Sequence, residues 1–141
     1  MAKVPPDLIA IDHDDYHAEH IGRTADGRQF FLTTPFVSGN EFVALYLFDE
    51  AGKLLDAIID EFGPRATMDK EVRDGTYEQR LQELGNVTFE RIEIAPFAVE
   101  RFGTTFGLIP DWDEEDSLSV ILQPGNYMAF YEPWDNGDYD T

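Results

Sequence analysis

Residues 41–49 read EFVALYLFD, and this run decides how the chain folds. Successive side chains of a β-strand point to opposite faces, and in this run both sets are apolar. One face would carry Phe42, Ala44, Tyr46 and Phe48, and the other Val43, Leu45 and Leu47. Because a strand with two apolar faces is typical of a sheet that is covered on both sides, the run predicts a central strand.

The residues that follow this run favour a β-hairpin. Residues 49–53, DEAGK, place a glycine where a left-handed residue closes a hairpin turn. Residues 54–62, LLDAIIDEF, then form the returning strand. A helix is the alternative, since four apolar residues also share one helical stripe, namely Leu54, Leu55, Ile58 and Ile59. We prefer the strand because the turn comes directly before it and Gly63-Pro64 ends it.

One main helix is predicted to end at Leu84. Its apolar face has helical spacing, Gly85 follows it, and Thr76-x-x-Gln79 matches a capping box at its start. The residues of this face are Tyr77, Leu81 and Leu84. The pattern also allows an earlier helical turn near Asp69, interrupted by Gly75.

Further short strands surround these elements. They are predicted at residues 28–34, 92–94, 97–99, 104–109, 118–122 and 127–131, with a turn at Phe102-Gly103. Since hairpins join most of them, we expect an α+β fold, with a mostly antiparallel sheet of about six or seven strands and one main helix packed on a face. We expect one domain over residues 1–141, in which residues 1–20 form an irregular N-terminal arm.

Composition excludes several classes of function. The chain has no cysteine, which excludes disulfides, thiolate nucleophiles and Cys-based zinc sites. It has no G-x-S-x-G, G-x-G-x-x-G or G-x-x-x-x-G-K motif. No signal peptide and no run of 18 apolar residues is found. We therefore expect a soluble cytoplasmic protein without a cofactor, and the sequence favours a non-enzymatic role over an enzymatic one.

The chain is strongly and unevenly acidic. Ten Lys and Arg against 29 Asp and Glu give a formal net charge of −19. Residues 111–141 contain nine acids and no base. This charge repels nucleic acids and anionic membranes, so we expect neither as a partner. An acidic face that only promotes solubility is one interpretation, and a docking surface for a basic protein is the other.

The C-terminal third supplies the candidate binding residues: Trp112, Asp113, Trp134, Asp135, Asp138, Tyr139 and Asp140. Aromatic side chains rimmed by acids are suited to binding a basic protein surface. Structurally, Trp134 between Pro133 and the Asn136-Gly137 turn predicts an aromatic plug that holds the C-terminus on the domain. The acids round Gly137 also suit a hard cation, but the closing glutamate of an EF-hand loop is missing.

All three histidines of the chain lie within residues 13–20, HDDYHAEH. On a helix, the spacing of His13, His17 and His20 would place the three imidazoles on one face, where three nitrogen ligands and a water suit a catalytic zinc ion. A polar arm whose histidines contact only solvent is the alternative. The cluster makes a metal-dependent hydrolase the second functional hypothesis.

Several motifs resemble a family of small bacterial proteins labelled formate hydrogenlyase regulatory protein. The motifs are IGRTADGRQFF at 21–31, FD-x-x-G at 48–52, I-x-PF-x-V at 94–99, FGL at 106–108, PWD at 133–135 and YDT at 139–141. The resemblance covers most of the chain from Ile21 onward and implies a regulatory role, but it transfers no catalytic or binding residue. Because the chain is acidic, such a role would act through another protein and not through DNA.

The leading hypothesis is thus an acidic protein, monomeric or homodimeric, that acts by contact with a basic protein. It would serve as a regulator or as an inhibitor or immunity-type partner. Mimicry of nucleic acid is a variant of this hypothesis, in which DNA would displace the protein from its target.

Overall fold

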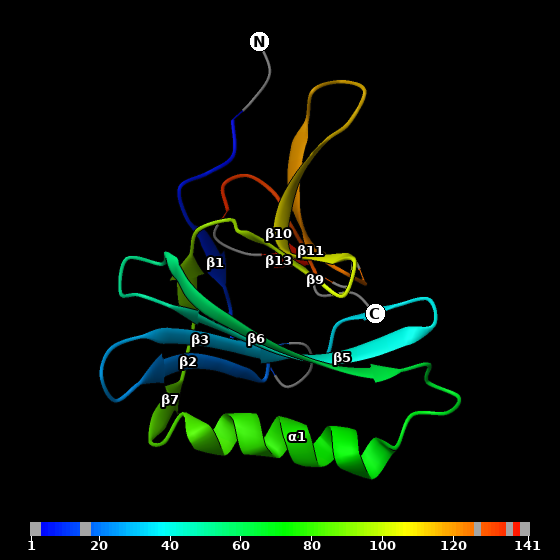
Figure 1. Cartoon of the computed structure of the whole chain (residues 1–141). Helices are drawn as coiled ribbons and strands as arrows, with labels where there is room; N and C mark the ends of the chain where they lie inside the picture. The colour runs from blue at the N-terminus through cyan, green and yellow to red at the C-terminus, as the bar shows by residue number, and fades with distance from the viewer. Residues whose placement is uncertain (1–3, 15–17, 126–127, 135–136, 139–141) are drawn as a thin grey trace.

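The computed structural model describes residues 4–14, 18–125, 128–134 and 137–138. Its strands form three antiparallel sheets in these residues, and a single helix lies below the largest of them in Figure 1. No helix in the described ranges is long and apolar enough to cross a membrane.

The largest sheet has six strands. Strand β5 pairs with β3 and with β6, β2 joins β3 to β7, and β4 pairs with the start of β5. The bounds are β2 His20–Thr24, β3 Gln29–Thr33, β4 Phe36–Val37, β5 Asn40–Phe48, β6 Leu54–Gly63 and β7 Val87–Phe89. The central strand and its hairpin partner are thus confirmed, and residues 54–63 are a strand and not a helix.

Both faces of β5 are buried, as the alternation of its apolar residues predicts. Its even-numbered side chains from Phe42 to Phe48 belong to the larger core, and Val43, Leu45 and Leu47 belong to a smaller one. The smaller core lies between the large sheet and helix α1 (Lys70–Glu83), which packs Tyr77 and Leu81 onto the sheet. The predicted apolar face of the helix is therefore confirmed.

Helix α1 begins earlier than the capping-box motif predicts. Asp69 is the N-cap and accepts a hydrogen bond from the backbone N–H of Val72, with 3.2 Å between the two heavy atoms. Thr76 lies inside the helix, and its hydroxyl donates to the carbonyl oxygen of Val72 at 2.9 Å. Gly75 does not interrupt the helix. The prediction of a start at Thr76 was wrong, and the helix begins at the earlier turn that the pattern allowed near Asp69, because Asp69 supplies a cap about two turns upstream.

The opposite face of the large sheet is covered by two smaller sheets (Figure 1). One contains β9 Ala98–Arg101, β10 Thr104–Trp112, β11 Leu118–Gln123, β12 Ala129–Phe130 and β13 Gly137–Asp138; the other pairs β1 Ile9–Ile11 with β8 Ile92–Ile94. The α+β class and the antiparallel pairing are confirmed. The expectation of one sheet of six or seven strands was wrong, because sequence period identifies strands but not which of them pair.

Strand β1 also corrects the expected N-terminal arm. Residues 9–11 are almost completely buried in the larger core, so the segment 1–20 is not irregular throughout. His20 at its end already belongs to β2.

A buried glutamine joins the large sheet to β8. The Gln29 side chain is completely buried; its amide nitrogen donates to the carbonyl oxygens of Glu93 at 2.9 Å and Asp49 at 3.2 Å. Its amide oxygen accepts from the backbone N–H of Glu93 at 2.8 Å. The amide therefore replaces, for one residue of β8, the backbone pairing that a neighbouring strand would give.

Candidate functional site

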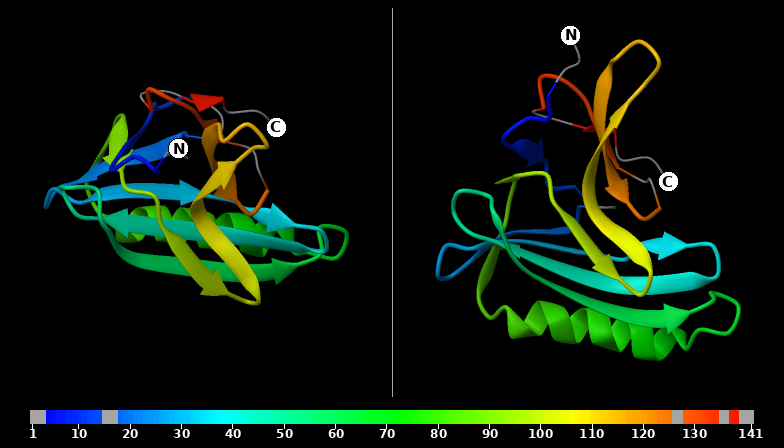
Figure 2. Two further views of the ribbon diagram at one scale, coloured as in Figure 1. Left: turned by 90° about the horizontal axis from the view of Figure 1, so that it is seen from above. Right: turned by 45° about the horizontal axis from the view of Figure 1, so that its top comes forward.

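The β10–β11 hairpin projects from the body of the molecule, on the side away from helix α1 (Figure 1 and the right-hand view of Figure 2). We call residues 111–117 the hairpin tip. All seven of these residues are exposed, and five of them are acids. The sequence predicts strands at 104–109 and 118–122, but β10 continues through Asp111 and Trp112, so the strands are longer and the loop between them is shorter than predicted.

The backbone of the hairpin tip is held by its own hydrogen bonds. The Asp113 carboxylate accepts from the backbone N–H of Glu115 at 2.8 Å and of Ser117 at 2.9 Å. The backbone of Asp113 also bonds Ser117, at 3.0 Å. Asp116 adopts a left-handed conformation with φ of 61°, which an aspartate tolerates at the end of such a turn. The hairpin tip is thus a turn ordered by its own hydrogen bonds and not an unstructured run of acids.

Trp112 ends β10 directly before this turn. It is 44% exposed and lies opposite Leu118 in the pairing of β10 with β11. A tryptophan of this exposure offers a large apolar contact area at low entropic cost. The structure therefore brings together two of the predicted binding residues, Trp112 and Asp113, on one exposed element.

Trp134 has a different position. Its side chain packs against the larger core, and its backbone carbonyl oxygen accepts from the N–H of Ala10 in β1 at 2.9 Å. This is the arrangement expected of a plug. Of the other predicted binding residues, Asp138 lies in β13, while Asp135, Tyr139 and Asp140 lie outside the described residues.

The described histidines contact an aromatic cluster. The rings of His13 and His20 lie 6.0 Å and 5.5 Å from the ring of Phe89, measured between centroids. His13 Nε2 bonds the carbonyl oxygen of Glu19 at 2.8 Å, and His20 Nδ1 bonds the hydroxyl of Tyr77. Within the described ranges, no three histidine or carboxylate side chains form a group suited to a metal ion. His17 lies outside those ranges, so zinc binding stays a prediction.

A basic hollow of about 310 Å³ is the feature that the sequence analysis missed. It lies at the N-terminal end of α1 and is lined by Arg65, Met68, Lys70 and Arg73. The available signal was local composition, because three of the ten basic residues of the chain occur within these nine positions. The signal is weak because acids alternate with these basic residues, so the net charge of residues 65–73 is close to zero.

Comparisons with protein-family models, with curated proteins and with solved structures find no match to the chain.

Proposed function

We propose that the protein acts by protein–protein contact and docks its hairpin tip onto a basic surface of a partner protein. It would act there as a regulator or as an inhibitor or immunity-type partner. The proposal rests on one observation: Trp112 is exposed directly before an acidic turn that its own hydrogen bonds hold in place.

Charge and shape both support this partner. The five carboxylates of the tip attract cationic side chains and raise the rate of encounter, while Trp112 supplies an anchor that loses apolar exposure on binding. Because the turn is already ordered, little conformational entropy is lost when it docks. An acidic run that served only solubility would need neither the ordered turn nor the exposed tryptophan.

Capture from a lysate of the source organism with matched baits tests the proposal. The tip variants are Trp112→Ala and the double variant Glu114→Gln/Glu115→Gln, which keeps the structural side chain of Asp113. The control Glu50→Gln/Glu78→Gln changes the net charge equally at two other exposed acids. We expect a basic protein that the wild type and the control retain and that both tip variants lose.

The retained protein is then purified and its affinity measured at two salt concentrations. We expect Trp112→Ala to weaken binding by about 2 kcal/mol, the size of a hot-spot truncation, and we expect added salt to weaken the wild-type complex. The same set of proteins on all four baits, or a complex that salt does not weaken, would contradict the proposal.

A further inference from the structure

The basic hollow combines cationic lining with a volume that admits a small molecule. Ligand sites in proteins begin at roughly 300 Å³, and the hollow has about 310 Å³. It is formed by the turn after β6 and the first turn of α1, where the backbone N–H groups of a helix favour an anion. In a protein with a net charge of −19, this concentration of basic side chains needs an explanation.

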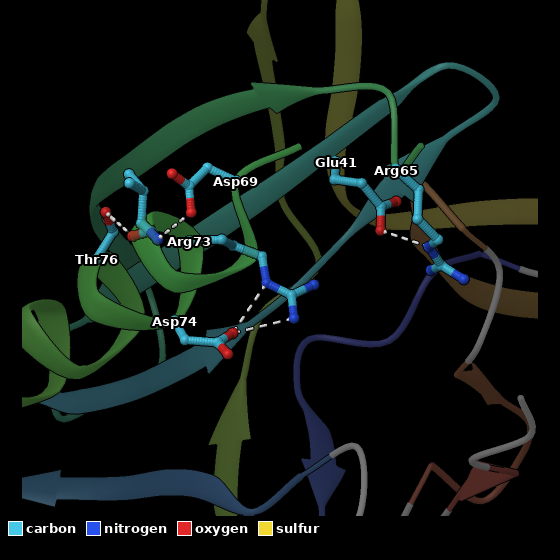
Figure 3. A network of polar contacts seen from close by, with 7 residues as sticks. Glu41, Arg65, Asp69, Arg73, Asp74 and Thr76 are labelled. Carbon is cyan, nitrogen blue, oxygen red and sulfur yellow. Dashed lines mark hydrogen bonds and ion pairs between the residues drawn. The ribbon is translucent and has the colours of Figure 1, made fainter. Parts of the chain in front are cut away.

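A buried carboxylate holds Arg65 in place. The Glu41 side chain is only 7% exposed, and its Oε1 accepts from Arg65 Nε at 3.0 Å, while the Arg65 side chain is 76% exposed. The Arg65 guanidinium also lies 6.0 Å from the centroid of the Phe36 ring. Burial of a carboxylate is unfavourable, so this pair is weak as a source of stability. What Glu41 does is fix an exposed guanidinium, as Figure 3 shows.

The terminal nitrogens of Arg65 stay open to a ligand. Only its Nε bonds to protein in the part of the chain that the structure describes, so four N–H donors of its guanidinium are free to bind an oxyanion. A guanidinium held by one edge and free at the other is suited to bidentate contact with phosphate.

Arg73, from the helix, is also held by a carboxylate, but here the arginine side chain is 20% exposed and that of its partner Asp74 is 56% exposed. Its Nε and Nη2 donate to Asp74 Oδ1 at 3.2 Å and 3.0 Å, which orients the guanidinium, as Figure 3 also shows, and leaves Nη1 without a described partner. Lys70 makes no ion pair among the described residues. The nearby Asp69 is used by the helix, because its carboxylate caps Val72.

We propose that the basic hollow binds the phosphate group of a small phosphomonoester. Two oriented guanidinium groups and one ammonium group match the double negative charge of such a group. Met68 adds apolar lining for the organic part of the ligand, for which the volume leaves room. This site is independent of the hairpin tip, since the tip lies on the other side of the large sheet (Figure 1).

Titration of isotope-labelled protein, followed by amide NMR, tests the proposal with inorganic phosphate and phenyl phosphate as probes. Sodium chloride at matched ionic strength is the reference. We expect saturable shifts confined to residues 65–74 with both probes and tighter binding of phenyl phosphate, because the ester also contacts Met68. Shifts that sodium chloride reproduces would overturn the site, and equal affinity for the two probes would overturn the phosphomonoester.

Variants of the basic hollow, each paired with a control of the same charge change, test where phosphate binds. Arg65→Ala and Lys70→Ala are each expected to weaken phosphate about tenfold, the effect of removing a charge-assisted contact. Arg101→Ala and Lys53→Ala remove the same charges at other exposed positions and should change the affinity less than twofold. Both hollow residues are exposed, so the amide spectrum should stay that of the folded protein. Equal weakening in all four variants would show an effect of net charge alone and contradict the proposal.

Glu41→Gln tests the positioning of Arg65. If the net charge controlled binding, loss of an acid would strengthen phosphate binding. We expect weaker binding by several-fold, because a neutral amide holds the guanidinium less firmly than a carboxylate does, and we expect no weakening in Glu78→Gln, which makes the same charge change on the exposed side of α1. Stronger binding in Glu41→Gln would show that Glu41 competes with the ligand and would contradict the positioning role.

Discussion

Gln29 shows how one side chain holds two layers together. Its amide makes three hydrogen bonds to the backbone, two of them to Glu93, and no part of it reaches solvent. A buried amide without these partners would be strongly unfavourable, and so would the backbone groups that it satisfies. The residue therefore fixes where β8 lies against the large sheet.

Gln29→Ala should lower the free energy of unfolding by roughly 2 to 4 kcal/mol, the sum of three lost hydrogen bonds and the desolvated groups left behind. Denaturant unfolding measures this change. Gln82→Ala is the control, since Gln82 is exposed on α1 and should change stability by less than about 0.5 kcal/mol. A similar loss in both variants would contradict the role of Gln29.

Asp26 should titrate below the ordinary range of aspartate. A hydrogen bond from the Thr24 hydroxyl lowers the pKa of its carboxyl most, and hydrogen bonds from Arg28 lower it further. Because the folded pKa is depressed, these bonds stabilise the fold above the unfolded pKa, and their contribution is lost as pH falls through the folded pKa. Thr24→Val should raise the pKa of Asp26 in a carboxyl NMR titration. Thr88→Val, on the exposed side of β7, should leave it unchanged.

Helix α1 contains a glycine that the fold does not need. A Cβ atom at Gly75 would meet no atom within 4 Å beyond its chain neighbours and the backbone of its own helix, and the residue lies inside α1. Gly75→Ala should therefore stabilise the protein by about 0.5 to 1 kcal/mol, the difference in helix propensity.

Gly85 supplies the contrast for this prediction. Space is also open there, but its φ is 75°, in the left-handed region, so Gly85→Ala should destabilise the protein by about 1 kcal/mol. Thermal unfolding of both variants distinguishes backbone strain from available space. A loss of stability in Gly75→Ala would contradict the continuous helix.

At this scale the sequence predicts elements better than their assembly. The β5–β6 hairpin could be predicted because both faces of β5 are apolar and a turn follows at once. The division into three sheets could not, because β1 finds its partner β8 far along the chain. The alternation of side chains with a period of two residues is the same in every sheet, so it does not specify which strands pair.

The two candidate sites differ in the same way. Trp112 and Asp113 could be found because an aromatic residue within a run of acids is visible in the sequence. That the Asp113 carboxylate orders the turn could not be predicted, and neither could the basic hollow. Glu41 and Arg65 are distant in sequence and meet only when β6 returns beside β5.

The whole molecule carries 29 acids and ten basic residues, and the resulting repulsion opposes the compact state. Sodium chloride screens this repulsion, and a rise from about 0.02 to about 0.5 M shortens the screening length from roughly 20 to roughly 4 Å. This change should raise the melting temperature by a few degrees. Scanning calorimetry in a buffer without phosphate measures the shift. A constant or falling melting temperature would show that the attractive pairs outweigh the repulsive ones.

The pairing of β1 also bears on the order of synthesis. Ile9 pairs with Ile94, and the N–H of Ala10 donates to the carbonyl oxygen of Trp134, so β1 is synthesised well before the residues that cover it. Until then its apolar residues are without cover in the nascent chain. The larger core can therefore close only after β8 has been synthesised, and until then the apolar segment Ile9–Ile11 is available to a chaperone.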